Sequence, residues 1–519
     1  NVIASDKVLY KGHAIAAVAA TEAHVAEDAL QLIEVEYELL APVLNVRDGM
    51  LETAPILHDE LRTKEVDGSE GDAASNVAAH LRHEKGDISK GFDEADVVIE
   101  REFETSMAHQ GYIEPHNGTA FWNQDGQLTV WTSTQGFFPV RDSVAELLRV
   151  PVSKVKVVPM EIGGGFGGKT VVYMEPVAAL LSKKSGNPVK FVMTRREVFE
   201  GTGPAPGSHI KVKIGAKRSG EIVAAQAHLA FEAGAFPGSA VSIAAETAFS
   251  AYNIPNVLID AYDVVVNKPK AAPYRAPCAP NAAFAAEQLV DELSEKLGID
   301  PIELRLANAP MEGTRRAAGP VFGTIGCTEV LEAMKDHPHY KAPLNGDNTG
   351  RGVSIGYWPN FGGEASATIS VRADGKVNLS EGSPDIGGSR AAMSMQVAET
   401  LGLKPQDVIP TVVDTDSIGY TETTDGSRTT FSTGIACVEA AKDAVRQMVE
   451  RAAAIWEIDG GDVEFEKGQF CSKSRPDLKM GFKELAGQLA ETGGRVLGRA
   501  ALHSRGAGGS FCGSLVDIE

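Results

Sequence analysis

A run of five glycines in six residues, at Gly163–Gly168, constrains this chain more than any other feature. Glycine loses more conformational freedom on folding than other residues, so a tight turn alone does not explain the run. An apolar stretch at 155–162 precedes it, Phe166 interrupts it, and a helix is expected to begin near Thr170, just after Lys169. The pattern is typical of a loop whose backbone approaches a ligand closely and directs N–H groups towards it.

The same loop contains the spacing G-x-G-x-x-G, at Gly163, Gly165 and Gly168, which occurs in dinucleotide-binding folds. Such a fold would place an acidic residue at the tip of the next strand, about 20 residues on. The strand expected at 189–193 is followed instead by Thr194 and two arginines, which could accept a 2′-phosphate. A nicotinamide-linked dehydrogenase therefore stays a minor alternative.

The charge balance excludes some partners. Lys and Arg number 49 against 70 Asp and Glu, which gives a net charge of −21. An acidic surface of this kind repels nucleic acid and anionic membranes. No apolar run approaches the roughly 20 residues that a membrane helix needs. The cysteines are too dispersed for a zinc or iron–sulfur motif or a disulfide framework; they are Cys278, Cys327, Cys437, Cys471 and Cys512.

Periodicity near the N-terminus predicts short elements. Residues 21–32 are expected to form a helix, and residues 8–20 have a strand-like pattern. At 33–39, apolar residues alternate with three glutamates, which predicts a half-buried strand. The small polar stretch at 68–76 suits a linker.

The middle of the chain gives clearer signals. Strands are expected at 129–132 and 154–158, and a helix at 282–297. Gly298 suits the position just after the end of that helix. Asp300 and the following proline suit the cap and first position of the next one.

A weak internal repeat is also present. Residues 144–158 and 397–413 both read as a helix, a turn with proline and a strand. Two similar halves would fit one ligand held between them, although chance recurrence of a common motif is the alternative.

Four segments, in a fixed order, resemble the molybdenum-binding subunits of the xanthine dehydrogenase and aldehyde oxidase family. They are Ser133-Thr134-Gln135 with the glycine loop about 28 residues later, PYRAPCAPNAAFAAE (273–287) with GIDPIELRLAN (298–308), PDIGGSR (384–390) and DTDSIGYTETTDGSRTT (414–430). Each is weak alone, and the ordered set is specific.

The resemblance implies an α+β fold class and a division of the chain that is incomplete at both ends. The expected parts are the remainder of an N-terminal hammerhead-type α/β domain (1–67), a linker (68–94), a first molybdenum-cofactor-binding domain (95–335), a linker (336–350) and the N-terminal part of a second such domain (351–519).

It also implies an oxidoreductase that uses a molybdenum–molybdopterin cofactor, expected in the cytosine dinucleotide form. In the family, water-derived oxygen enters an aldehyde or N-heteroaromatic carbon, hydride passes to the molybdenum centre, and a Glu acts as base. Expected partners are a small iron–sulfur subunit carrying [2Fe–2S] clusters, a FAD subunit or other electron acceptor, a second piece of the molybdenum subunit, and a small-molecule substrate. A cytoplasmic location is expected, or a periplasmic one through a partner's export signal.

Site residues follow from the same resemblance. The cofactor-binding residues would be Gln135, Gly164, Gly165, Phe166, Gly167, Arg275, Gly387, Gly388, Ser389, Ser427, Thr429 and Cys512. Molybdenum would have no direct protein ligand, with Gln135 and Phe166 near it. The glycine loop and the turns at 387–390 and 426–430 would supply N–H donors and positive groups for an anionic cofactor. Substrate-pocket candidates by approximate position are Thr170, Pro277, Tyr357 and Trp358; the two aromatic rings would either stack on a substrate or pack in the core.

Three departures from the family pattern bear on the substrate and the cofactor. Thr170 stands where purine-specific members have Glu, which weakens the case for a purine. Cys278 lies two positions beyond the cysteine of carbon monoxide-oxidising members, which weakens that reading. Gly388 and Ser389 replace part of a Gly-Gln-Gly turn, so an amide contact to the pterin would be lost or replaced by backbone.

The catalytic base is not assigned. The family's Gly-x-Gly-Glu-Pro segment does not occur before Glu519, so the expected Glu lies beyond it and the isolated chain is expected to be inactive. Asp385 and Asp425 are expected to serve local turns, and Glu175 to lie about two turns into a helix. A non-catalytic half of a split subunit is the alternative.

Overall fold

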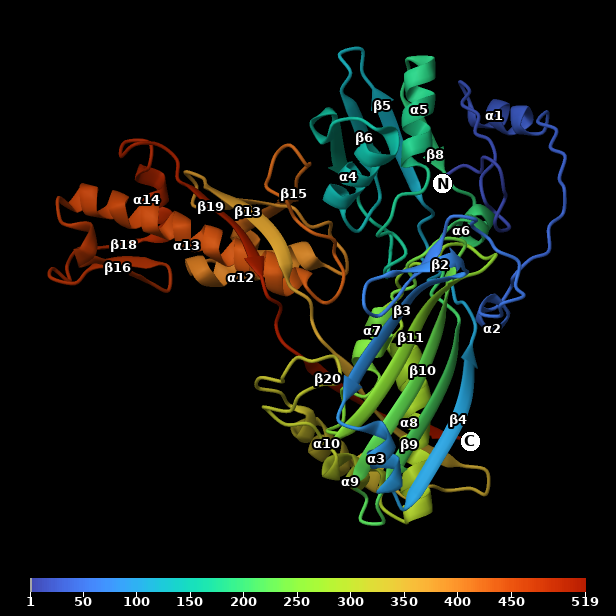
Figure 1. Cartoon of the computed structure of the whole chain (residues 1–519). Helices are drawn as coiled ribbons and strands as arrows, with labels where there is room; N and C mark the ends of the chain where they lie inside the picture. Colours follow the sequence, from blue (N-terminus) through green and yellow to red (C-terminus); the bar gives the residue numbers. More distant parts are fainter. Residues whose placement is uncertain (1) are drawn as a thin grey trace.

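Seven strands form the largest sheet of the protein, which the computed structural model describes from residue 2 to residue 519. The strand order is β2-β1-β3-β11-β10-β9-β4, and one face packs against helix α8 (Ala279–Leu297) (Figure 1). The strands are β1 (Arg62–Lys64), β2 (Glu70–Ala74), β3 (Val77–Lys85), β4 (Val97–Thr105), β9 (Ser208–Ala216), β10 (Ile222–Gly234) and β11 (Asn256–Val265). Ile210, Phe231 and Leu289 are buried in the core that the sheet and helix share.

Helix α8 has the predicted form. It buries Leu289 and Leu293 and ends at Gly298, whose φ of 67° is the left-handed conformation that glycine favours. Asp300 then caps α9 (Pro301–Ala307) by accepting hydrogen bonds from the N–H groups of Ile302 and Glu303. Both predicted boundaries are confirmed.

The segment 68–94 was expected to be a linker, and this is wrong. It contributes β2 and β3 to the large sheet and then forms helix α3 (Ile88–Asp93). Its small and polar residues are tolerated because β2 lies at the edge of the sheet, where one side of the strand meets solvent.

A first four-stranded unit lies between β4 and β9 in the sequence. Strands β5 (Asn117–Trp122) and β6 (Leu128–Thr132) form a hairpin, and helix α4 (Phe137–Leu148) leads through a short 3₁₀ turn (Val152–Lys154) to β7 (Val155–Pro159), which is parallel to β6. Helix α5 (Glu175–Ser185) then leads to β8 (Val189–Val192) beside β5, and α6 (Arg195–Gly201) follows.

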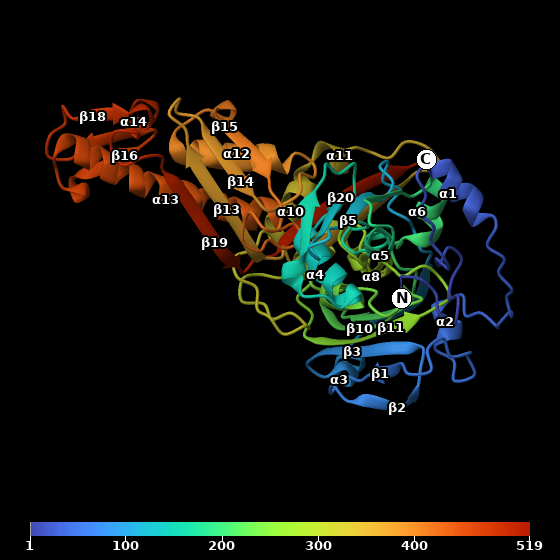
Figure 2. The same ribbon diagram turned by 90° about the horizontal axis from the view of Figure 1, so that it is seen from above.

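A second unit repeats this plan. The corresponding elements are β13 (Gly363–Val371), β14 (Val377–Glu381), α12 (Ser389–Leu401), a 3₁₀ turn (Pro405–Asp407), β15 (Val408–Val412), α13 (Thr429–Trp456) and β19 (Leu497–Ser504). Strand β14 is parallel to β15, and β13 pairs with both β14 and β19, as in the first unit. The repeat expected from the sequence is confirmed, and the two units lie above and beside the large sheet (Figures 1 and 2).

Smaller elements complete the chain. Helices α7 (Val241–Thr247), α10 (Cys327–Asp336) and α11 (Pro338–Lys341) lie near the large sheet, and β12 (Gly350–Trp358) pairs with β20 (Ser510–Ile518). Strands β16 (Val463–Glu466), β17 (Gln469–Ser472) and β18 (Lys479–Gly481), a 3₁₀ turn (Gly460–Asp462) and helix α14 (Phe482–Gln488) extend the second unit. Among residues 2–519, no helix combines the length and apolar character that crossing a bilayer requires.

The N-terminal strands were predicted wrongly. The segment contains helices α1 (Ala23–Leu30) and α2 (Val46–Gly49), but residues 8–20 and 33–39 form no strand. Leu39 is 93% exposed although it belongs to the alternating pattern. An alternating pattern gives a segment one apolar face, but a strand also needs a hydrogen-bonded partner strand. Within residues 2–519 no strand pairs with these segments.

Candidate functional site

Four loops meet where the two units face each other. They are 133–136 and the glycine loop 163–169 of the first unit, and 382–388 and 413–428 of the second. Gln135 and Thr424 are hydrogen-bonded across this boundary, at 2.8 Å for Thr424 N–H to Gln135 O and 2.9 Å for Gln135 Nε2 to Thr424 O. Arg390 reaches Glu161 at 2.9 Å. The repeat therefore brings equivalent loops of both units together.

The glycine loop requires its glycines. Gly164 and Gly167 have φ of 92° and 107°, which disfavour other residues. A Cβ at Gly165 would lie 2.5 Å from Gln135 Oε1, and one at Gly167 would lie 2.4 Å from the backbone oxygen of Pro273. The expected helix start at Thr170 is wrong, since α5 begins at Glu175.

Gln135 fixes this loop. Its Oε1 accepts hydrogen bonds from Gly167 N at 2.8 Å and Lys169 N at 3.2 Å, and its side chain is buried. The carbonyl oxygen and one amide N–H, the one that reaches Thr424, are thus used within the protein. The second N–H of the amide remains available to a ligand.

Arg275 and Phe166 lie together. Arg275 N–H donates to the Phe166 oxygen at 3.0 Å, and the guanidinium carbon is 6.0 Å from the centre of the phenyl ring. Phe166 is 43% exposed. The Arg275 side chain is exposed and makes no ion pair with any residue in the range 2–519. Arg275, Ala276 and Cys278 all have positive φ, a strained arrangement that concentrates at functional sites.

Two other cations that were expected to contact a ligand are buried and bond to groups of the protein instead. Lys169 pairs with Glu114 at 2.6 Å and has a fully buried side chain. Arg428 donates to the backbone oxygens of Gly362, Glu422, Thr423 and Glu364 at 2.6–3.2 Å. The expectation that they supply positive charge to a ligand is therefore wrong, and of these three cations Arg275 is the one left to face a ligand.

Helices α12 and α13 begin beside these loops. The residue before each helix makes no side-chain cap bond; in α12, Asp385 accepts a hydrogen bond from the N–H of the second residue, Arg390, at 3.1 Å. Gly387 and Gly388 face open space, while Ser389 is buried. The hydroxyls of Thr424 and Thr429 are buried and have no partner in the described chain. Uncapped N–H groups and unpaired hydroxyls suit an anionic ligand. Ser427 is exposed and has φ of 65°.

The proposed pocket residues separate into two groups. Thr170 Oγ1 donates to Gly167 O at 2.9 Å, so Thr170 lies at the loop, and half-buried Pro277 lies two residues after Arg275. Trp358 Nε1 donates to Gly426 O at 3.2 Å. Tyr357 instead packs against Phe322 and Phe511 and accepts a hydrogen bond from Arg316, which corresponds to the core alternative.

Cys512 lies on strand β20, which pairs with β12, the strand that carries Trp358. It is exposed on β20 opposite Gly356, and among residues 2–519 no side chain of the four loops bonds to it.

Nearby carboxyls differ in their availability. Although burial opposes it, Arg390 holds the pKa of Asp385 below its usual value. Burial raises the pKa of Asp425 to about 6, and Arg428 opposes the shift. Glu175 is the first residue of α5, not two turns in; it accepts from the Thr132 hydroxyl at 2.9 Å, and burial raises its pKa.

A fourth carboxyl, Glu381, ends β14 beside loop 382–388. It is 1% exposed, its Oε2 accepts from Ser383 N, and its Oε1 has no partner in the described chain. Burial raises its pKa to about 8.

A pH dependence follows for Glu381. Because its pKa is higher in the folded state, its contribution to stability is complete below the unfolded pKa and is lost as pH rises through about 8. Each pKa unit corresponds to about 1.4 kcal/mol. Glu381→Gln should therefore raise the free energy of unfolding at pH 8 more than at pH 5, measured by urea titration. An equal change at both pH values would contradict a neutral Glu381.

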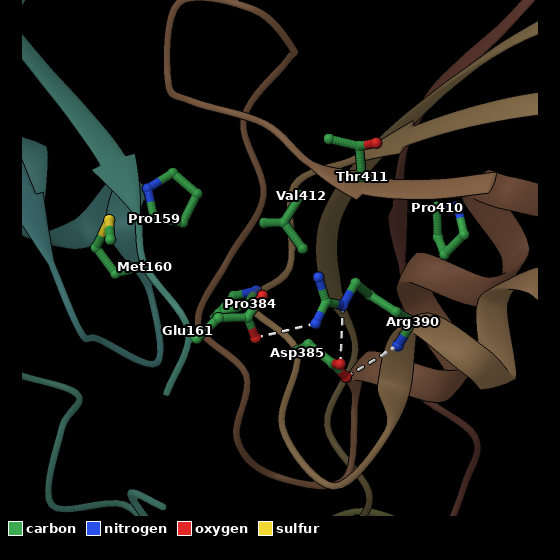
Figure 3. Close-up of a pocket in the computed structure, with 9 residues that line it drawn as sticks. All are labelled: Pro159, Met160, Glu161, Pro384, Asp385, Arg390, Pro410, Thr411 and Val412. Atoms are coloured by element: carbon green, nitrogen blue, oxygen red, sulfur yellow. Dashed lines mark hydrogen bonds and ion pairs between the residues drawn. The ribbon is translucent and has the colours of Figure 1, made fainter. Parts of the chain in front are cut away.

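A cavity of about 240 Å³ lies between the two units (Figure 3). Pro159, Met160 and Glu161 form its wall from the first unit, and Asp385 and Arg390 lie opposite. Its wall residue Glu161 lies two residues before the glycine loop in the sequence.

Three residues under the glycine loop were not found from the sequence. A Cβ at Gly168 would lie 2.8 Å from the Tyr112 ring, and Gln110 Nε2 donates to Pro273 O at 2.8 Å. Glu114 accepts from Gly163 N at 2.6 Å. They lie on an irregular segment without periodicity; only the closeness of several polar residues could have indicated them.

Two family models match most of the chain. Residues 70–309 and residues 331–509 each match a model described as a molybdopterin cofactor-binding domain. The first contains the first unit and most of the large sheet, and the second contains the repeated unit.

Individual proteins agree with these matches. A probable xanthine dehydrogenase subunit of Bacillus subtilis is 30% identical over 94% of this chain and 66% of its own length. The large molybdopterin subunit of a nicotinate dehydrogenase of Eubacterium barkeri is 31% identical over 64% of this chain and 76% of its own. The crystal structure of a Cu,Mo carbon monoxide dehydrogenase superimposes with a TM-score of 0.85 at 25% identity, over 100% of this chain and 71% of that one. The chain thus spans about two thirds to three quarters of these proteins.

Proposed function

This chain belongs to the molybdenum hydroxylase family as a molybdopterin-binding large subunit, and from that premise we propose that its four loops hold the cofactor of a hydroxylating oxidoreductase. The observation that carries the proposal is the convergence of the glycine loop and Gln135 with loop 413–428 across the two repeated units. One ligand held by both units would contact all of these loops.

The residues fit an anionic pterin cofactor. Arg275 makes no ion pair within residues 2–519 of a protein of net charge −21, and the buried hydroxyls of Thr424 and Thr429 lack partners in the described chain. Glycine at 164, 165 and 167 lets backbone N–H groups approach the ligand. We assign cofactor contacts to these residues, to the second N–H of Gln135, and to the turn at 387–389. The dinucleotide form of the cofactor belongs to the same proposal.

The reaction that we propose is hydroxylation of an aldehyde or N-heteroaromatic carbon: R–H + H₂O → R–OH + 2 H⁺ + 2 e⁻. The bound cofactor would supply the two-electron redox centre, and the electrons would leave to a [2Fe–2S] partner and on to FAD or another acceptor. In this chain, Phe166 would exclude water beside the cofactor, and Thr170 with Pro277 would border the substrate.

A test combines metal content with turnover. The complete enzyme, with its partner subunits, should contain molybdenum by elemental analysis and oxidise an aldehyde or an N-heterocycle with an artificial electron acceptor. Arg275→Ala should lower molybdenum content at least about tenfold, since the loop loses its unpaired cation. Arg372→Ala, which removes a half-buried arginine paired with Asp374 on a different strand end, is the control.

Other results would redirect the proposal. Wild-type protein with molybdenum but no turnover on either substrate class would favour the non-catalytic half of a split subunit. Absence of molybdenum together with nicotinamide binding would favour the dehydrogenase alternative. Normal metal content in Arg275→Ala would remove Arg275 from the site.

A further inference from the structure

Glu114 lies directly beneath the glycine loop and joins three segments of the chain. Its Oε2 accepts hydrogen bonds from Lys169 Nζ, Ser133 Oγ and Gly163 N, each at 2.6 Å. Its Oε1 accepts from Asn117 at 2.9 Å, and its own N–H donates to Gly163 O at 3.2 Å. One carboxylate therefore contacts both ends of the loop.

Lys169 completes the arrangement from the other side. Its side chain is 0% exposed, and its ammonium also donates to Ser133 Oγ at 3.2 Å and lies 5.0 Å from the centre of the Tyr112 ring. A lysine so placed cannot reach a ligand outside the loop without leaving its partner. Its positive charge is instead balanced inside the protein by Glu114.

The electrostatics agree with an ionised pair. Although burial alone would raise it, the hydrogen bonds from Lys169, Ser133, Gly163 and Asn117 hold the pKa of Glu114 below its usual value. Burial lowers the pKa of Lys169, and Glu114 opposes this shift. Each charge thus depends on the other.

We infer that Glu114 and Lys169 are positioning residues, whose buried ion pair sets the conformation of the glycine loop and thereby its affinity for the cofactor. The effect on cofactor affinity rests on the proposed function, whereas the effect on the loop conformation rests on geometry alone. Ser133 extends the effect to Gln135, which lies two residues further along and bonds to Gly167. Glu114 would thus fix the loop at Gly163 and Lys169, and Gln135 would fix it at Gly167.

A double-mutant cycle tests the inference in the full chain with its partners. The variants are Glu114→Gln, Lys169→Met and the combination, all close in size to the original residues. Removing one partner leaves a buried unpaired charge, whereas removing both does not. The single variants should lower molybdenum content at least about fivefold, and the double variant should retain at least about half. A double variant that falls to the product of the two single effects would overturn the pairing.

A second measurement does not depend on the cofactor. Hydrogen exchange at 163–170 should accelerate at least about tenfold in each single variant of the cofactor-free chain, and less in the double variant. Unchanged exchange would overturn the positioning role. Glu221→Gln, which breaks an exposed Lys–Glu pair of 2.8 Å on a distant hairpin, should change neither readout.

The two proposals fail in different ways. If wild-type protein holds no molybdenum, the proposed function fails while hydrogen exchange still decides the positioning role. If the single variants do not fold, Ser133→Ala removes one donor to Glu114 and keeps the pair. It should accelerate exchange at 163–170 about twofold to fivefold, and unchanged exchange would again overturn the inference.

Discussion

Replacing Gly165 with Val should give a folded chain that holds less than about a tenth of the wild-type cofactor. A Cβ at this position would meet Gln135 Oε1 at 2.5 Å and Cδ at 2.9 Å, and the valine methyl groups would extend further. Gln135 cannot move aside freely because three hydrogen bonds hold its buried side chain. Overpacking of this kind costs about 1–3 kcal/mol, which a large domain tolerates. The loop, however, would move away from the ligand.

Molybdenum analysis and circular dichroism of the same preparation measure the two parts of this expectation. Gly323→Val is the matched control, since a Cβ added at Gly323 would meet no atom within 4 Å and the residue has an ordinary φ. A Gly165→Val protein with full metal content would mean that the glycine loop is only a turn.

Replacing Arg428 with Met should destabilise the second unit by at least about 3 kcal/mol, because hydrogen bonds to a charged group contribute about 1.5–3 kcal/mol each. The guanidinium is 1% exposed and donates to four backbone oxygens, among them those of Gly362 and Glu364. Arg428→Lys should restore little of this loss, since an ammonium cannot reproduce the planar fork of donors.

Urea unfolding of the two variants checks this expectation. Arg446→Lys is the control within α13, the helix that begins directly after Arg428, because the Arg446 side chain is 65% exposed and pairs only with Asp443 at 2.9 Å among the residues from 2 to 519. If Arg428→Met unfolds at the same urea concentration as the control, the loop 413–428 does not depend on this residue.

Local signals in the sequence predicted the elements that depend on neighbours along the chain. Helix α8, the glycine after it and the Asp300 cap follow from spacing within a few residues, and the structure confirms them. The helix–turn–strand repeat was visible for the same reason. Residues 33–39 carried an equally regular pattern, yet a strand also needs a partner, which no local pattern specifies.

The site was predictable where the chemistry of backbone and glycine decides it. The glycine loop, Gln135 and Arg275 do lie together, and the units that hold them match the two expected cofactor-binding domains. The direction of long side chains was not predictable. Lys169 and Arg428 look like ligand contacts in the sequence. In the structure, Lys169 pairs with Glu114, 55 positions away, and Arg428 donates to backbone oxygens such as that of Gly362. Glu114 was missed because its role exists only through those distant partners.

The bonds between Gln135 and Thr424 also bear on how the protein is made. The two residues are 289 positions apart. At a synthesis rate of about 5–20 residues per second, Gln135 leaves the ribosome about 15–60 s before Thr424 does. During that interval Gln135 lacks its partner Thr424, so a nascent chain contains only the two loops of the first unit, 133–136 and 163–169. The loops of both units can therefore contact one ligand only after Thr424 has emerged and the two units have docked.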